Sequence, residues 1–172
     1  SKQAAIYDST QGSDIYGNYI NYTGFFTNGF AILNPGHYSK IHDNVIVNNH
    51  GRGIHIFATN NLVYNNYVEV KQGRNQEYWA GTYGAYGIQV ECESSWMAPP
   101  KGAHNSIYNN TIIAWADADN GDATAMRFTG NGESFFGGPD CVNNSVYDND
   151  FTAITSDASR VARPIAVGGV ED

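Results

Sequence analysis

The sequence predicts an all-β protein, a right-handed parallel β-helix of about five coils with three short strands per coil. Three observations lead to this fold: a ten-residue pattern that recurs along the chain, a shorter alternating pattern between its copies, and an asparagine at one fixed position of every copy. Recurring units that cannot bury their own apolar face are typical of a solenoid, in which each coil packs on its neighbours. The copies of the longer pattern are Ser13–Tyr22, Ser39–Asn48, Asn61–Val70, Asn105–Ala114 and Asn144–Ala153.

Each ten-residue copy contains an apolar residue, an aromatic residue or histidine, a variable residue, asparagine, another variable residue and a second apolar residue. The side-chain amide of asparagine both donates and accepts hydrogen bonds, so asparagines in stacked coils can bond to one another. Asparagine also tolerates the left-handed backbone that a tight corner requires. We therefore expect a buried ladder at a corner between two strands, formed by Asn18, Asn44, Asn66, Asn110 and Asn149.

The shorter pattern is a small residue followed by apolar, variable and apolar residues. Alternation over so few residues indicates a short strand with one buried face. The predicted strands are Gly29–Ile32, Gly53–Ile56, Gly87–Val90, Ala125–Phe128 and Pro164–Val167. Stacked in coil order, their outward residues are Ala31, His55, Gln89, Arg127 and Ala166. The next outward column is Leu33, Phe57, Glu91, Thr129 and Gly168.

The later coils carry long insertions on both sides of this shorter strand. Insertions in a solenoid usually gather on its binding face, so we expect them to wall a groove whose floor is the sheet of these strands. Aromatic rings with a polar edge suit the faces of sugars, although aromatic residues also serve to pack long loops. The insertions are about Lys71–Tyr86, Glu93–Ala103, Trp115–Thr124, Thr129–Val142 and Ile154–Arg163. Their candidate sugar-stacking residues are Tyr78, Trp79, Tyr83, Tyr86, Trp96 and Trp115.

The repeats, with their recurring asparagine, resemble those of the pectate-lyase-like superfamily of right-handed parallel β-helices. The resemblance covers nearly the whole chain and implies a site on the sheet of the shorter strands and a polysaccharide as the substrate. Members of the superfamily include polysaccharide lyases, glycoside hydrolases, surface adhesins and phage tailspikes, so the fold leaves the activity open. The signature motifs of pectate lyases and polygalacturonases are missing from this sequence.

A polysaccharide lyase is the first functional hypothesis, with His55, Gln89, Glu91 and Arg127 as candidate catalytic residues. Such an enzyme neutralises the carboxylate of a uronate, removes the proton at C5 and protonates the leaving oxygen. Arg127 or His55 would be the base, and a loop tyrosine would be the acid.

A glycoside hydrolase instead requires two carboxyl groups beside the scissile bond. Glu91 with one of Glu77, Asp117 and Asp119 would supply them. A noncatalytic carbohydrate-binding or adhesive surface solenoid is the alternative from another class. The outward residues would then form an ordinary solvated strand face with an Arg127–Glu91 ion pair, which would add little stability.

Asp117, Asp119 and Asp122 lie in a short segment rich in Asp, Asn and Gly, just before Arg127. Closely spaced carboxylates are the hard oxygen ligands that Ca²⁺ prefers, and a bound Ca²⁺ would help to neutralise an acidic sugar. Turns without metal use the same residue types, so both interpretations stay open.

The chain of 172 residues has a net charge of −8, and charged residues make up only 15% of it. No basic stripe suits a nucleic acid, and no apolar run is long enough to span a membrane. Cys92 and Cys141 fall in predicted turns, where they would form a disulfide in an exported protein or remain two buried thiols. We expect an extracellular, cell-surface or periplasmic location.

Neither end of the sequence shows an amphipathic capping helix, which solenoids need for solubility. We therefore expect one β-helix domain over residues 1–172, either a segment of a longer solenoid or a domain with uncapped ends. Such ends would pair with further coils or with another chain.

Overall fold

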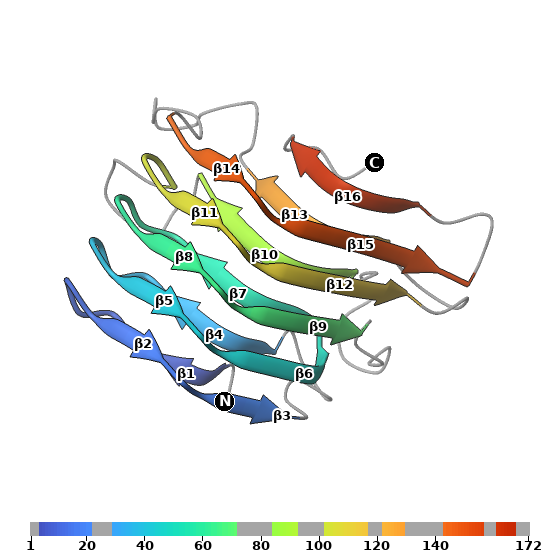
Figure 1. Ribbon diagram of the computed structural model, residues 1–172, viewed down its shortest axis with the longest axis horizontal. Coiled ribbons are helices and arrows are strands. Elements are labelled where there is room, and N and C mark those ends of the chain that lie inside the picture. Colours follow the sequence, from blue (N-terminus) through green and yellow to red (C-terminus); the bar gives the residue numbers. More distant parts are fainter. Residues whose placement is uncertain are drawn as a thin grey trace.

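The computed structural model is a right-handed parallel β-helix, as the sequence predicts (Figure 1). It describes residues 4–21, 29–71, 84–92, 102–116, 122–129, 143–156 and 161–167. These residues form three parallel sheets and no helix. In the described part of the chain, therefore, no helix is long and apolar enough to cross a membrane.

Each of the first five coils contributes one strand to each of three sheets, which we name A, B and C, and β16 (Ala162–Val167) begins a sixth coil in sheet A. Sheet A contains, in order, β1 (Ala4–Tyr7), β4 (Phe30–Asn34), β7 (Arg52–Ile56), β10 (Ala85–Glu91), β13 (Ala123–Thr129) and β16 (Ala162–Val167). Sheet B contains β2 (Asp14–Tyr16), β5 (Lys40–His42), β8 (Leu62–Tyr64), β11 (Ser106–Tyr108) and β14 (Ser145–Tyr147). Sheet C contains β3 (Tyr19–Asn21), β6 (Val45–His50), β9 (Tyr67–Lys71), β12 (Thr111–Ala116) and β15 (Asp150–Thr155).

The interior is filled by aliphatic side chains from all three sheets. Ile41 of sheet B, Ile46 of sheet C and Ile54 of sheet A are fully buried. Glycine is needed where sheet A comes close to sheet C. A Cβ atom at Gly87 would lie 2.2 Å from Ile112 Cγ2, and one at Gly53 would lie 2.5 Å from Val68 Cγ1. This close approach explains why the shorter pattern begins with a small residue.

The predicted asparagine ladder is confirmed at the corner between sheets B and C. From Asn44 onward, the side-chain Oδ1 accepts hydrogen bonds from the backbone N–H and from Nδ2 of the ladder asparagine in the preceding coil, at 2.9–3.1 Å. The Nδ2 groups also donate to strand carbonyls, as Asn66 does to Ile41 O at 2.9 Å. Asn44, Asn66 and Asn110 are buried, so these bonds satisfy polar groups that water does not reach.

The left-handed backbone of this corner lies one residue before the ladder asparagine, and not at the asparagine as expected. The φ angles are 66° at Gly17, 53° at Asp43, 56° at Asn65, 53° at Asn109 and 53° at Asp148. Short polar residues and glycine tolerate this conformation. The ladder position therefore requires asparagine for the hydrogen bonds of its side-chain amide. The position before it requires a residue that tolerates a left-handed backbone conformation.

A second ladder, which the sequence reasoning missed, lies at the start of sheet B. Asn61 and Asn105 each donate their backbone N–H to the Oδ1 of the asparagine in the next coil, Asn105 and Asn144, at 2.9 Å. Ser39 N–H donates to Asn61 Oδ1 at 2.8 Å. The signal was present in the sequence, because Ser or Asn begins every copy of the ten-residue pattern.

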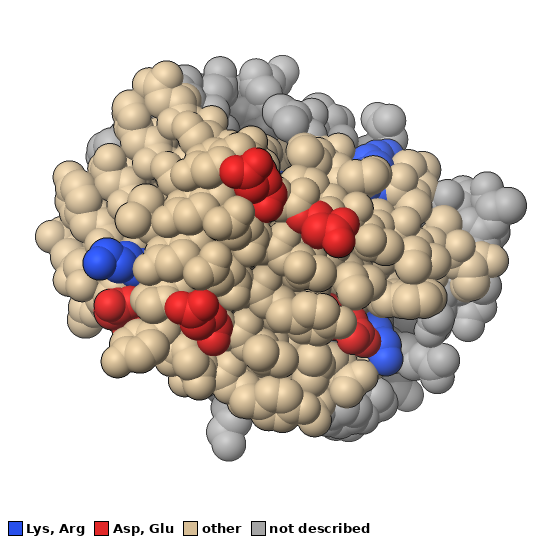
Figure 2. All heavy atoms as spheres, in the orientation of Figure 1, with Lys and Arg blue, Asp and Glu red and all other residues tan. Residues whose placement is uncertain are grey.

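Two further expectations concern the cysteines and the surface charge. Cys92 is disulfide-bonded, and Cys141 lies outside the described residues. Figure 2 shows one face of the molecule, on which the charged residues in the described part are few and scattered. On that face, Lys and Arg do not gather into a stripe.

Candidate functional site

The predicted row of polar residues lies on adjacent strands of sheet A. Strand β10 lies between β7 and β13, and Gln89 is paired with His55 on one side and with Arg127 on the other. These three residues are therefore consecutive neighbours, as alternation within the short strands predicts. Glu91 pairs with Thr129 in the next column.

Strand β4 differs from the predicted alignment by two residues. Leu33, and not Ala31, pairs with His55, because Phe30 lies opposite Arg52 and Ile32 opposite Ile54. The prediction aligned Gly29 with Gly53, but every residue from Phe30 to Leu33 is apolar, so this segment lacks the alternation that would fix its register. On this side the cluster is bordered by a leucine and not by an alanine.

The side chain of His55 is a buried, neutral imidazole that packs against two phenylalanine rings. Its side chain is 2% exposed, and its ring lies 5.0 Å from the Phe30 ring and 4.1 Å from the Phe57 ring, centre to centre. Nε2 lies 2.9 Å from Glu91 Oε2, yet neither ring nitrogen makes a well-aligned hydrogen bond with the described residues. Burial lowers the pKa of His55 from 6.5 to about 4, and the charges of Arg52 and Arg127 lower it too, while Glu91 opposes the shift.

Arg52 belongs to this cluster, although the sequence reasoning did not select it. Its Nε donates to Gln89 Oε1 at 2.8 Å, and Gln89 Nε2 donates in turn to Thr129 Oγ1 at 3.2 Å. The Arg52 guanidinium lies 5.1 Å from the centre of the Phe30 ring and 5.7 Å from that of Tyr86. Arg52 comes directly before the Gly-initiated pattern, which is why inspection of that pattern alone overlooked it.

Arg127 lies over the same tyrosine. Its guanidinium is 4.7 Å from the centre of the Tyr86 ring, a distance at which the cation is attracted to the ring face. Glu91 contacts His55, and the Arg127–Glu91 ion pair of the alternative with a solvated strand face is not seen among the described residues. Of the two candidate aromatic residues that the structure describes, Tyr86 and Trp115, Tyr86 lies within the cluster.

The other candidate residues lie elsewhere or outside the described residues. Trp115 is on β12 of sheet C, 43% exposed, and does not join the row on sheet A. Asp122 accepts a hydrogen bond from Arg163 Nη1 at 2.7 Å. Among the described residues, no three His, Cys, Asp or Glu side chains lie together as a possible metal site, and calcium stays a prediction. The candidates outside the described residues are Tyr78, Trp79, Tyr83, Trp96, Asp117 and Asp119.

The described cluster combines two guanidinium groups, one carboxylate, an amide and a neutral imidazole, in a chain with a net charge of −8. Guanidinium groups recognise carboxylates and phosphates through paired hydrogen bonds, and aromatic faces recognise sugar rings. This composition suits an anionic ligand with an apolar face. Comparison with protein-family models, with curated proteins and with solved structures finds no match for the chain.

Proposed function

We propose that the chain is a polysaccharide-acting β-helix module that binds an acidic glycan across the outer face of sheet A. The observation that carries this proposal is the row of His55, Gln89 and Arg127 on consecutive coils, joined by Arg52. A sugar carboxylate would pair with the two guanidinium groups, because they are the cations of this row. The resemblance of the repeats to pectate-lyase-like β-helices supports the same face and the same class of ligand.

The reaction that these groups favour is β-elimination at a uronate. His55, neutral at pH 7, would take the C5 proton while the bond between C4 and the leaving oxygen breaks and a C4=C5 double bond forms. Tyr86 would give a proton to the leaving oxygen, and Arg52 and Arg127 would stabilise the negative charge that develops on the carboxylate. A bound Ca²⁺ at Asp117, Asp119 and Asp122 would assist this neutralisation.

A noncatalytic carbohydrate-binding or adhesive solenoid is the second candidate. It is favoured by the burial of His55 and Gln89, whose exposed fractions are 2% and 3%, because a catalytic base must contact its substrate. Both candidates place the protein outside the cytosol. The disulfide bond of Cys92 supports an extracellular, cell-surface or periplasmic location.

Product analysis distinguishes the candidates. The protein is incubated with pectins, alginates and neutral glycans, with and without calcium, and ultraviolet absorbance and reducing ends are followed. A lyase produces reducing ends together with the absorbance of the new double bond. His55→Gln and Arg127→Gln should then lower turnover about a hundredfold or more, because each removes a group that acts in the transition state.

Lys40→Gln serves as the control for these variants, because Lys40 is an exposed cation on β5 of sheet B, away from the row on sheet A. Reducing ends without the absorbance would indicate a hydrolase, and binding without turnover would indicate the noncatalytic solenoid. Neither binding nor turnover with any acidic glycan would contradict the proposed function.

A further inference from the structure

Three buried side-chain atoms near the corner between sheets A and B have no hydrogen-bond partner in the described part of the chain. They are Asn34 Nδ2, Ser39 Oγ and Asn61 Nδ2, and all three residues are fully buried. Native proteins satisfy nearly all buried polar groups, either with protein atoms or with ordered water. Three such atoms near one corner therefore require an explanation.

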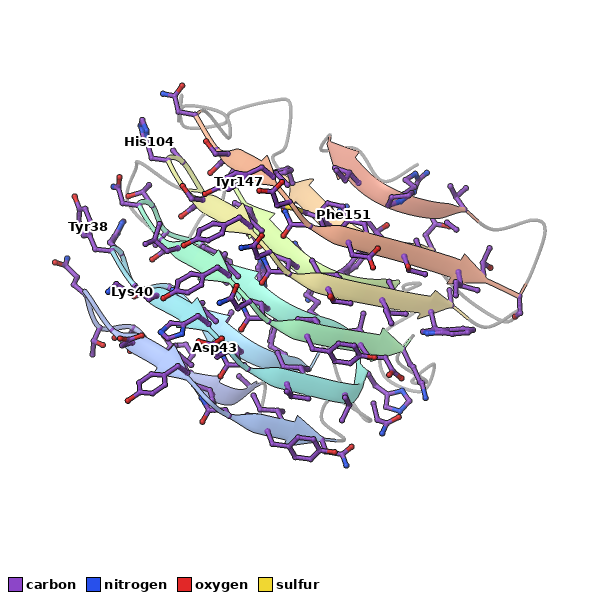
Figure 3. All side chains as sticks on the ribbon, in the orientation of Figure 1. Tyr38, Lys40, Asp43, His104, Tyr147 and Phe151 are labelled. Carbon is purple, nitrogen blue, oxygen red and sulfur yellow. The ribbon has the colours of Figure 1, made fainter. Side chains whose placement is uncertain are left out.

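This corner follows the same path in successive coils. Asn34 of the second coil (β4–β6) pairs with Ile56 of the third coil (β7–β9). The backbone is left-handed four residues after each of them, and again in the next coil, with φ angles of 56–59° at Tyr38, Asn60 and His104. Figure 3 labels Tyr38 and His104, which lie on the same side of the solenoid. Two residues before these left-handed positions lie the equivalent residues Gly36, Ala58 and Gly102.

In the later coils, the side-chain amide of the second ladder bonds to the carbonyl at this equivalent position. Asn105 Nδ2 donates to Ala58 O at 3.1 Å, and the next coil repeats this bond at 2.7 Å. Asn61 occupies the same place one coil earlier, so its amide is directed toward the turn at Gly36. The turn at Gly36 differs from the later ones, because Asn61 Nδ2 makes no such bond within the described residues.

The other two unpartnered atoms belong to the same turn. Asn34 Oδ1 accepts the N–H of Gly36 at 3.0 Å, which holds the Asn34 amide against the turn. Ser39 ends the turn, and its backbone N–H donates to Asn61 Oδ1 at 2.8 Å, so Ser39 lies beside the Asn61 amide. Side chains that belong to two coils are thus gathered around one short segment, residues 34–39.

The residue types at this corner distinguish the second coil from the coils that follow. The inward position of Asn34 is taken by Ile56 and Val90 in the next two coils. Ser39 stands where those coils have Asn61 and Asn105. Serine is smaller than asparagine by about the volume of one water molecule. The second coil therefore combines an additional buried amide with a shorter side chain in the second ladder.

The chemistry of the three atoms selects a neutral ligand. The two Nδ2 groups donate hydrogen bonds, so they do not suit a cation. An anion would lie one coil away from the carboxylate of Asp8, which is the counterpart of Asn34 in the first coil. A water molecule accepts from both amides and donates to the serine hydroxyl, and buried waters typically make about three hydrogen bonds.

We propose that an ordered water molecule is bound at this corner and bridges Asn34 Nδ2, Asn61 Nδ2 and Ser39 Oγ. It takes the place of the amide that the second ladder lacks at Ser39. The second ladder thereby continues into the second coil through water, whereas the later coils continue it through direct bonds. This proposal is independent of the proposed function on the outer face of sheet A.

A crystal structure of the 172-residue protein, at a resolution that shows ordered water, tests this site. A water oxygen should lie about 2.7–3.2 Å from each of the three atoms. The equivalent corner of the next coil is the control within the same crystal, because Asn105 Nδ2 should bond to Ala58 O directly. The Ser39→Asn variant should lack this water, since the added amide fills its place.

Circular dichroism establishes that Ser39→Asn is folded. If it is not, Asn34→Val replaces it, because this substitution introduces the residue that Val90 provides in a later coil, and it should also remove the water. A wild-type structure in which Asn61 Nδ2 bonds directly to Gly36 O, or in which no water bridges Asn34 and Asn61, would overturn the proposal. The same water retained in the folded Ser39→Asn variant would also overturn it.

Discussion

Replacing Asn66 with alanine should lower the free energy of unfolding by roughly 3 kcal/mol or more. Asn66 is 2% exposed and sits in the middle of the ladder. Its side chain accepts from Asn44 N and Nδ2 and donates to Asn110 Oδ1 and Ile41 O. Alanine removes these four bonds. Asn110 Oδ1 still accepts from the backbone N–H of residue 66, and Asn44 Nδ2 still donates to Ile15 O. The buried N–H of Asn44 loses its acceptor and Ile41 O loses the side-chain donor, and each unsatisfied group costs about 1–3 kcal/mol. Urea unfolding followed by circular dichroism measures the difference.

Asn18→Ala is the matched control for this substitution. Asn18 occupies the same position in the first coil, is partly exposed, and accepts no bond from a preceding coil within the described residues. We expect Asn18→Ala to lower the free energy of unfolding by about 1 kcal/mol, the net contribution of an ordinary hydrogen bond. Equal losses for Asn18→Ala and Asn66→Ala, or an Asn66→Ala variant as stable as the wild type, would show that the ladder does not stabilise the fold.

Acid should destabilise the protein through His55. The folded protein keeps this imidazole neutral down to its pKa of about 4, whereas the unfolded chain takes up a proton near 6.5. The contribution of His55 to the free energy of unfolding should therefore be fully present above pH 6.5. As the pH is lowered toward 4, the free energy of unfolding should fall by about 3 kcal/mol in total. The hydrogen bond from His42 lowers the pKa of Asp43 from 3.8, so Asp43 titrates below this window.

His55→Phe should remove this acid dependence, because phenylalanine fits among Phe30 and Phe57 and does not titrate. His104→Asn is the control, since His104 is exposed and has a φ of 56° that asparagine tolerates. Urea unfolding at pH 7 and near pH 4 gives the comparison. The same loss of stability in acid for His55→Phe and the wild type would assign the effect to other groups.

The sequence predicts the fold well because the repeated features have local physical causes. A buried amide that must bond to its equivalent in the next coil fixes asparagine at one position, as at Asn44 and Asn66. Alternation fixes the outward direction of His55, Gln89 and Arg127, and parallel pairing then makes them neighbours.

The parts of the site that the sequence did not predict depend on contacts between side chains. The predicted register of β4 was wrong because an all-apolar segment can shift by two residues without burying or exposing a polar side chain. Strand spacing places Glu91 near both His55 and Arg127, and only side-chain conformation selects the contact with His55. The role of Arg52 depends on its hydrogen bond to Gln89, a residue on another coil.

Binding of a purified oligouronate to the protein, measured by calorimetry, tests most directly that sheet A carries a site for acidic glycans. Arg52→Gln and Arg127→Gln should each weaken binding about tenfold to a hundredfold, the effect of losing a charge-assisted hydrogen bond of about 1.5–3 kcal/mol. Lys40→Gln, which removes an exposed positive charge from sheet B, should bind like the wild type. No binding by the wild-type protein, or equal weakening in all three variants, would contradict the proposed site.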